Sequence, residues 1–329
     1  MCVTSVPDNE EIAPTPEAAA SGLAAERTRR INRIDAMRAA GVNPYPYRFD
    51  RTHTLGEIRE QHGHLEAGNE TETRVTVAGR ILLKRDQGKL IFCTIRDRAA
   101  DIQLFISKSV VGDTEFDEIN ELDLGDWVGV TGLVMTTRKG ELSIKVESAQ
   151  LLSKAVRPLP DKWHGLSDRE TKYRKRHLDL MSNQPSADLF IIRSQIVAEI
   201  RNFLHERGYL EVETPMLHDV AGGAAARPFK THHNTLDMTL YMRIANELYL
   251  KRLIVGGFNG VYEFSKDFRN EGMSRFHNPE FTQMELYVAY KDYNWMMEFA
   301  EQLSRVFTLC ISSQFSSFTL IKSVRYYSS

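Results

Sequence analysis

The chain has 329 residues, of which 42% are hydrophobic and 26% charged, as in a water-soluble globular protein of about two ~150-residue domains. The net charge of -2 leaves any RNA binding to a local basic patch, and no run of ~18 apolar residues predicts a membrane span. The three cysteines, Cys2, Cys93 and Cys310, lie too far apart for a metal-ligand spacing or a disulfide framework. We therefore expect a cytoplasmic protein.

The first segments are a tail and a helix. Residues 1–23 contain prolines and acids without the basic-then-apolar order of a signal peptide, so we expect a disordered tail. Ala24–Ala40 is rich in Arg, Ala and Ile and predicts a helix that ends at Gly41, within an N-terminal helical segment covering residues 24–73. The arginines of this helix either contact RNA phosphates or form a solvated face.

Residues 74–155 predict a β-barrel. The expected strands are Arg74–Leu83, Leu90–Asp97, Asp101–Ser107, Trp127–Thr136 and Leu142–Leu152. A short acidic helical stretch, Asp113–Leu122, lies between the third and fourth strands, which is the order of an OB-fold. OB-folds bind single strands through exposed aromatics and cations, so Phe92 and Arg80 are candidate contacts. The alternative is that Phe92 is a core residue.

A linker and a long helix follow. We expect residues 156–185 to be a linker that includes the basic run Lys172–His177. Ala187–Arg207 carries apolar residues three and four apart, which predicts a helix with one apolar face that stops at Gly208. A short strand should follow and end at Pro215.

The next two segments combine glycines with a helix start. Val220–Asn234 predicts a flexible segment whose glycines allow close approach of the backbone to a ligand. Met242–Gly257 predicts a helix that begins near Asn246, with Glu247 in its first turn. A glutamate there usually compensates the helix dipole, and ligand binding is the alternative.

Val261–Tyr290 predicts two strands joined by a turn-rich segment, Gly272–Pro279, that carries Arg275 and His277. Side chains alternate between the two faces of a strand, and one face should also be backed by an apolar row. The residues expected on the shared polar face are Arg269, Glu271, Phe281, Glu285 and Tyr287. This combination suits a bound anion and a flat ring, and the alternative is a solvated face with cross-strand ion pairs.

Several strings resemble class II aminoacyl-tRNA synthetases. F-R-N-E followed by R-F-H-N-P-E-F-T-Q-M-E-L-Y resembles motif 2, in the form found in the lysyl-tRNA synthetase family. The helix and strand of Ala187–Pro215 resemble motif 1, and V-A-G-R, G-K-L-I-F and D-I-Q-L-F resemble the anticodon-binding barrel. The resemblance implies a multidomain α+β protein: an OB-fold barrel, then a partial antiparallel-sheet catalytic domain over residues 186–307.

The resemblance also implies a function, that of an ATP-dependent lysine–tRNA ligase. Arg269 would be catalytic, bridging the lysine carboxylate and the α-phosphate of ATP. The implied ATP-binding residues are Arg269, Glu271, Arg275, His277, Asn278 and Phe281. The implied lysine-binding residues are Gly223, Glu247, Arg269, Glu285 and Tyr287. The implied anticodon-binding residues are Arg80, Phe92 and Gln103, with Glu147 shifted by about one position from an expected acidic contact. The implied partners are lysine, ATP, the tRNA for lysine, and a second copy bound through Ala187–Pro215.

The resemblance stops near Val306, and residues 308–329 form a divergent tail. Motif 3 and the acids that hold Mg²⁺ would lie beyond this point, so we expect no metal ligand in this chain and no activity from it alone. Two alternatives remain: a non-catalytic RNA-binding protein derived from a synthetase, and an aspartyl- or asparaginyl-tRNA synthetase relative that shares the barrel and motifs 1 and 2.

Overall fold

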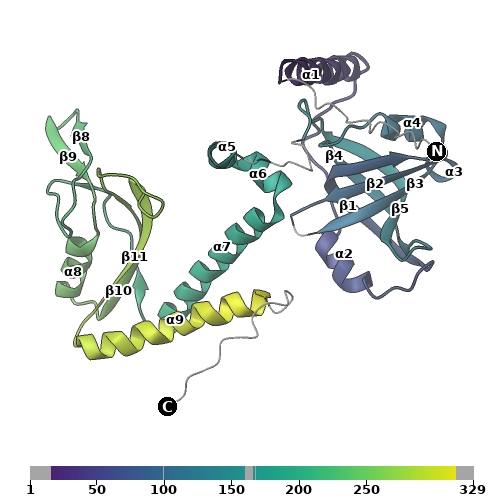
Figure 1. Ribbon diagram of the computed structural model, residues 1–329. Helices are drawn as coiled ribbons and strands as arrows, with labels where there is room; N and C mark the ends of the chain where they lie inside the picture. The colour runs from purple at the N-terminus through teal and green to yellow at the C-terminus, as the bar shows by residue number, and fades with distance from the viewer. Residues whose placement is uncertain (1–15, 99, 160–165, 167, 316–329) are drawn as a thin grey trace, which may run out of the picture. The chain divides into compact units, whose positions relative to one another are not determined.

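The computed structural model describes residues 16–98, 100–159, 166 and 168–315. The chain divides into two compact units, and the boundary along the sequence lies between Ser182 and Asn183 (Figure 1). Within the described residues, no helix combines the length and hydropathy required to cross a membrane.

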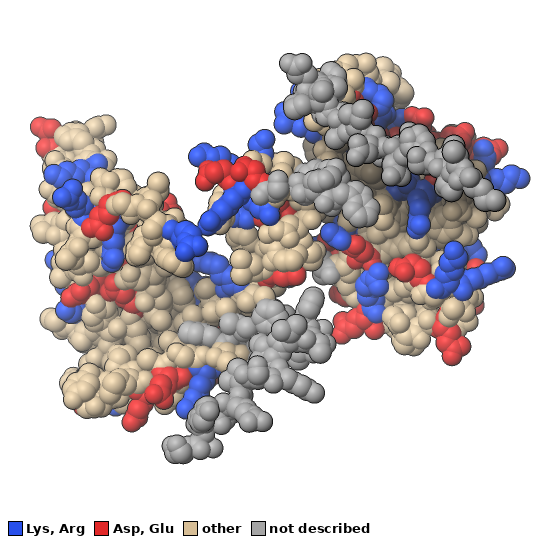
Figure 2. Space-filling model, in the orientation of Figure 1, with Lys and Arg blue, Asp and Glu red and all other residues tan. Residues whose placement is uncertain are grey.

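A closed five-stranded barrel forms the centre of the first unit. Its strands are β1 (Glu70–Asp86), β2 (Leu90–Arg96), β3 (Asp101–Ser107), β4 (Trp127–Thr136) and β5 (Leu142–Ser153), in the spatial order β1-β2-β3-β5-β4. Two short helices, α3 (Lys108–Val111) and α4 (Asp113–Asn120), lie between the third and fourth strands, which confirms the predicted order. Figure 2 shows acidic and basic side chains interspersed on the visible face of this unit.

Alternation along the strands fills the barrel. In β2, Ile91, Cys93 and Ile95 are buried, while the residues between them face outward. The aliphatic side chains of all five strands meet in one core. Burial of apolar surface is the main favourable term in folding, so this alternation fixes which side chains of each strand remain available on the outside.

Helix α1 (Pro16–Ala39) begins before the predicted start at Ala24, so the expectation of disorder is wrong for residues 16–23. Proline is favoured in the first turn of a helix, and the alanines after it are strong helix formers. The end is as predicted, because Gly41 has a φ of 76°, a left-handed conformation that glycine adopts readily. Residues 1–15 lie outside the described part of the chain.

The arginines of α1 fasten the helix to the barrel. Arg30 is 4% exposed and its Nη1 donates to the carbonyl oxygens of Leu124 and Ala155, 3.1 Å from each. Arg29 forms an ion pair with Asp123, and Arg33 pairs with Glu121. Arg30 is therefore buried against the barrel, while Arg29 pairs with Asp123 and keeps half of its side chain exposed.

A further helix of this unit, α2 (Leu55–His62), lies inside the N-terminal helical segment predicted for residues 24–73, although its bounds were not predicted. Its N-terminus is a capping box, in which Thr54 Oγ1 accepts from the backbone N–H of Glu57 and the Glu57 carboxylate accepts from the backbone N–H of Thr54. After the barrel come α5 (Arg169–Arg174) and α6 (Arg176–Ser182), inside the segment predicted as a linker.

The second unit contains two three-stranded sheets. In the order of the chain its elements are α7 (Gln184–His205), β6 (Leu210–Glu211), β7 (Leu217–His218), β8 (Lys230–His233), β9 (Met238–Met242), α8 (Glu247–Val255), β10 (Gly260–Phe268), β11 (Glu280–Val288) and α9 (Tyr293–Phe315). The sheets have the orders β11-β10-β6 and β7-β9-β8. The prediction of flexibility over Val220–Asn234 is wrong at its end, because β8 pairs with β9 there.

The first of these sheets has an apolar face that packs on α7 and α9. Tyr262 and Phe264 of β10 and Met284 and Leu286 of β11 form one core with residues of both helices. These side chains are the apolar row that the alternation predicted. The polar row therefore lies on the opposite face, where α8 packs against β10 and β11.

Candidate functional site

The antiparallel pairing of β10 and β11 sets the polar face. Asp267 lies opposite Phe281, Glu263 opposite Glu285, and Val261 opposite Tyr287. Directly opposed residues project from the same face of a sheet. The predicted side chains of β11 therefore share one face with the carboxylates of β10, and Arg269 continues the same alternation just beyond the strand. The face is not a solvated one, since Glu263 is 3% exposed and Asp267 is fully buried.

Arg269 is held at the open end of this hairpin. Its backbone N–H donates to the carbonyl oxygen of Pro279, 2.8 Å away, and its guanidinium carbon lies 5.0 Å from the centroid of the Phe281 ring. Its Nε is buried, and among the described residues it has no hydrogen-bond partner. A buried donor without a partner destabilises the fold by ~1–3 kcal/mol, so this nitrogen is suited to a bound acceptor.

Glu285 and Tyr287 form a polar pair further along β11. The Tyr287 hydroxyl donates to Glu285 Oε2, 3.2 Å away, and the side-chain amide of Gln283 donates to the other carboxylate oxygen. Burial raises the pKa of Glu285, and the negative charges of Asp267 and Glu247 raise it further. Burial also raises the pKa of Tyr287. The pocket thus favours a cation that would neutralise the carboxylates.

Gly223 and Glu247 are in close contact. Gly223 has a φ of 91°, and a Cβ added to it would lie 3.2 Å from the Cβ atoms of both Ala245 and Glu247. Only glycine fits this backbone comfortably. Glu247 stands in the first turn of α8, where its Oε1 accepts from Lys251 Nζ, 2.6 Å away. Helix α8, which begins at Glu247, packs against β10 and β11, so Gly223 and Glu247 lie beside the polar face of the hairpin.

The loop residues lie apart from the rest. Glu271 accepts from the backbone N–H of Arg227, 3.2 Å away, which ties the loop to the segment after β7. Arg275, His277 and Asn278 are exposed. His277 Nδ1 lies 2.8 Å from Ser274 Oγ, which shapes the turn internally. The structure thus brings Gly223, Glu247, Arg269, Phe281, Glu285 and Tyr287 together, and leaves the three loop residues at the surface.

Sequence reasoning missed the buried polar residues beneath this face. Arg243 is 3% exposed and forms ion pairs with Glu263 and Asp267. Alternation alone places Glu263 and Asp267 on a polar face without showing that this face is closed to water. The available signal was Arg243 itself, a single cation in the apolar string Y-M-R-I-A, which has to be paired if that string is buried.

On the outer face of the barrel, Phe92 lies half-buried and edge-on to Phe105, with 5.5 Å between the ring centroids. Phe92 is therefore not a core residue. Gln103, one strand away, donates from Nε2 to Ser143 Oγ, 3.0 Å away. Arg80 lies further along β1, donates to the carbonyl oxygen of Gly125 and packs over Trp127. It belongs to a different row from Phe92, whose partner in β1 is Arg85.

The barrel face also holds residues that sequence reasoning missed. Paired residues form a row across four strands of the barrel: Arg85 of β1 lies opposite Phe92 of β2, Phe92 opposite Phe105 of β3, and Phe105 opposite Lys145 of β5. The row thus contains two aromatic rings with a cation at each end. In D-I-Q-L-F the apolar residues Ile102 and Leu104 alternate with Asp101, Gln103 and Phe105, and this pattern was sufficient to place Phe105 on the outer face. The register of β4 and β5 shifts between Thr131 and Gly132, and Glu147 is the residue left unpaired by the bulge. A β-bulge changes the direction of the side chains beside it, and Glu147 is the acid that lies about one position from an expected acidic contact.

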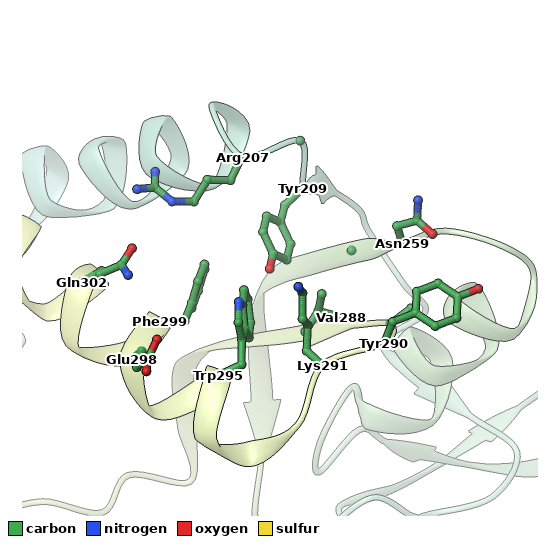
Figure 3. A pocket seen from close by; sticks show the side chains of 13 residues that line it. Arg207, Tyr209, Asn259, Val288, Tyr290, Lys291, Trp295, Glu298, Phe299 and Gln302 are labelled. Atoms are coloured by element: carbon green, nitrogen blue, oxygen red, sulfur yellow. The ribbon is translucent and has the colours of Figure 1, made fainter.

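A cavity of about 560 Å³ opens at the other end of the hairpin (Figure 3). It is lined by Tyr209, which follows α7, and by Lys291, Trp295 and Phe299 around the start of α9. None of the predicted site residues lines it. The predicted site is therefore the polar face of β10 and β11, and not this cavity.

The described residues do not fit a metal ion by themselves. No group of three or more His, Cys, Asp or Glu side chains among them is arranged to hold one.

Comparisons with known proteins cover both units. The family described as tRNA synthetases class II (D, K and N) matches residues 168–324, and the OB-fold nucleic acid binding domain matches residues 75–152. A lysine–tRNA ligase of Enterococcus faecalis is 52% identical over 278 residues, which are 84% of this chain and 56% of that protein. That of Carboxydothermus hydrogenoformans is 50% identical over 274 residues, 83% of this chain and 55% of that protein. The chain spans a little over half the length of these curated relatives.

Proposed function

Because the chain belongs to the class II aminoacyl-tRNA synthetases of the aspartate, lysine and asparagine group, we propose that its second unit binds lysine and ATP for the synthesis of lysyl-adenylate. In this reaction a lysine carboxylate oxygen attacks the α-phosphorus of ATP, and pyrophosphate leaves. Catalysis then consists of holding two anionic reactants in line and stabilising the charge between them, so no covalent enzyme intermediate is required.

Arg269 is the residue that holds the two anions together. Its planar guanidinium donates in parallel to a carboxylate and to a phosphate oxygen, which a lysine ammonium does with less directional control. The buried, unpartnered Nε is the single observation that supports this role best. A ligand acceptor at that nitrogen removes the penalty of leaving it unpaired.

The adenine lies against the Phe281 ring, and Glu271 accepts from its exocyclic amino group. The guanidinium of Arg269 already packs over the same ring, 5.0 Å from its centroid, which supports a flat ligand beside the arginine. Arg275, His277 and Asn278 reach the triphosphate and the adenine edge from the exposed loop. Their exposure supports a contact that forms when ATP binds and the loop closes over it.

The amino acid lies at the other end of the face. Gly223 and Glu247 hold its α-ammonium, while Glu285 and Tyr287 face its ε-ammonium. Three carboxylates that interact electrostatically support a cationic side chain as the preferred substrate. The same charges repel the side chain of aspartate, which separates this site from those of the aspartyl-tRNA synthetases.

The first unit binds the anticodon of a lysine tRNA through the outer face of its barrel, with Phe92 stacking on a base and Arg80 and Gln103 beside it. The aromatic pair of Phe92 and Phe105, with cations at both ends of its row, supports this role. The protein acts as a cytoplasmic homodimer through Ala187–Pro215. Leu189 and Phe190, which are 65% and 48% exposed on α7, support such an interface.

The proposal is tested with a non-hydrolysable lysyl-adenylate in which a sulfamoyl group replaces the phosphate. Calorimetric titration of the chain should give micromolar or tighter binding that Arg269→Ala abolishes. Arg305→Ala, which removes an exposed arginine of α9, is the matched control and should leave the affinity unchanged. Equal binding by the wild type and Arg269→Ala would show that this face is not the site.

A further inference from the structure

A buried polar cluster lies directly beneath the proposed site, and its hub is Arg243. This residue stands between the end of β9 and Asn246, which precedes α8, and it is 3% exposed. Its Nη1 lies 2.7 Å from Glu263 Oε1, and its Nε lies 3.2 Å from Asp267 Oδ1. The Nε also donates to the carbonyl oxygen of Lys266. Among the described residues, the Arg243 side chain forms no hydrogen bond or ion pair with a side chain assigned to lysine or ATP.

Glu263 connects the cluster to two other segments. Its Oε2 accepts from the Thr214 hydroxyl at 2.7 Å and from Asn246 Nδ2 at 3.2 Å. Arg243 itself donates from Nη1 to the carbonyl oxygen of Thr214, 3.1 Å away. One ion pair thus joins the segment after β6, the start of α8 and the middle of β10.

The backbone of Arg243 completes the link. Its N–H donates to the carbonyl oxygen of Met216, and its own carbonyl oxygen accepts from the N–H of Phe268, each at 2.9 Å. Phe268 directly precedes Arg269, and Asn246 directly precedes Glu247. Arg243 therefore holds Phe268 directly and Asn246 through Glu263, and these two residues are the neighbours of the groups proposed to bind the carboxylate and the α-ammonium of the amino acid.

Stability alone does not explain a pair buried in this way. Removing two charges from water costs several kcal/mol for each, and replacing such a pair by apolar residues of similar volume is often neutral or stabilising. Asn246 adds a further penalty, because its Oδ1 is buried and has no hydrogen-bond partner among the described residues. The benefit of the buried pair is therefore that it fixes the positions of the segments that it joins.

We propose that Arg243 is a positioning residue that fixes the spacing between Arg269 and Glu247. The inference rests on the proposed function. The carboxylate and the α-ammonium of an amino acid are bonded to the same carbon atom, so their receptors have no freedom to drift apart. A misplacement of ~1 Å in such a site lowers a rate by ~100-fold. The Arg243 guanidinium contacts Asp267, two residues before Arg269, and Glu263, which accepts from Asn246, so this one side chain links the segments that carry both receptors.

The experiment compares the wild type with the double variant Arg243→Met/Glu263→Met, which removes both charges and retains the volume. The matched control is Arg305→Met/Glu301→Met. It removes another arginine–glutamate pair of the same unit, with an N–O distance of 4.0 Å, at side chains that are 79% and 74% exposed. Thermal unfolding, hydrogen exchange and calorimetric binding of ATP and of the sulfamoyl lysyl-adenylate are measured for each protein.

We expect the double variant to unfold cooperatively but at a lower midpoint than the wild type, because Asp267 keeps a buried charge without its partner Arg243. Hydrogen exchange should accelerate at least tenfold in both segments, residues 244–250 and 266–270. Affinity for the lysyl-adenylate analogue should fall at least 30-fold, while affinity for ATP alone changes less than threefold. A purely structural defect would weaken both ligands equally. Arg243→Lys, which keeps the charge without the fork, should lie between the two, and the control should match the wild type.

Two results would overturn the proposal. The first is wild-type affinity for the analogue in the double variant, which would mean that the spacing does not depend on Arg243. The second is faster exchange in only one of the two segments, because Arg243 would then not couple them. If the wild type binds no analogue, the proposed function of this chain fails, and the exchange data still decide whether Arg243 couples the segments.

Discussion

Replacing Phe92 by alanine should separate RNA binding from folding. Phe92 lies on the outer face of β2, while its neighbours Ile91 and Cys93 are in the core of the barrel. The change removes one edge-on contact with Phe105, worth ~0.5–1.5 kcal/mol. By comparison, Ile91→Ala opens a cavity and should destabilise the unit by ~2–5 kcal/mol.

The expected effect on binding is larger than the effect on stability. Stacking of one base on an aromatic side chain contributes ~1–3 kcal/mol, which corresponds to a loss of ~5–150-fold in affinity. Fluorescence anisotropy with the anticodon stem–loop of a lysine tRNA measures this loss at fixed salt. Phe105→Ala is the matched variant, and its effect shows whether the second ring also binds a base.

Thermal unfolding of the same proteins provides the control. Phe92→Ala should shift the unfolding midpoint by a few degrees at most, and Ile91→Ala by clearly more. It should also leave affinity for the lysyl-adenylate analogue unchanged, because that site belongs to the other unit. If Phe92→Ala destabilises the barrel as much as Ile91→Ala does, or keeps full affinity for RNA, the assignment of Phe92 to the RNA-binding face is wrong.

Three further predictions concern the second unit. Arg269→Ala in a version of the enzyme that contains all three motifs should abolish lysine-dependent ATP–pyrophosphate exchange, and near-normal exchange would refute its role. Glu285→Gln should abolish binding of the lysyl-adenylate analogue yet raise the unfolding midpoint at neutral pH. Burial raises the pKa of Glu285, so its ionised form destabilises the fold, and this penalty disappears as the pH falls from above the raised pKa towards the unfolded value. In the wild type, lysine affinity should fall as the pH falls through the same window, and an affinity that does not change with pH there would contradict this. Leu189→Glu should reduce the mass found by light scattering from that of a dimer to that of a monomer, whereas a dimer at every concentration would exclude this face of α7.

Regular patterns made much of the fold predictable. Apolar and polar residues alternate along β2, β10 and β11, and this local pattern is visible in the sequence. It predicts which side chains of each strand share a face. The helix before Gly208 is an equally clear case, since its apolar stripe and its glycine are both local features. Helix α2 lies within the predicted helical segment of residues 24–73, and the capping box of Thr54 and Glu57 is the local signal that marks its start.

The buried polar cluster was not predictable in the same way. Glu263 and Asp267 alternate with aromatic residues, as any half-exposed strand does. What buries them is Arg243 and Asn246, which arrive from a different part of the chain. Alternation says which side chains share a face, but tertiary packing decides whether water reaches that face.

Substrate identity is the central claim, and competition among three aminoacyl-adenylate analogues tests it most directly. Sulfamoyl analogues carrying lysine, aspartate and asparagine differ only at the side chain, which the proposed pocket of Glu247, Glu285 and Tyr287 would read. The account predicts that the chain binds the lysyl analogue at least 100-fold more tightly than the other two. Equal affinities, or a preference for the aspartyl analogue, would contradict the assignment to lysine.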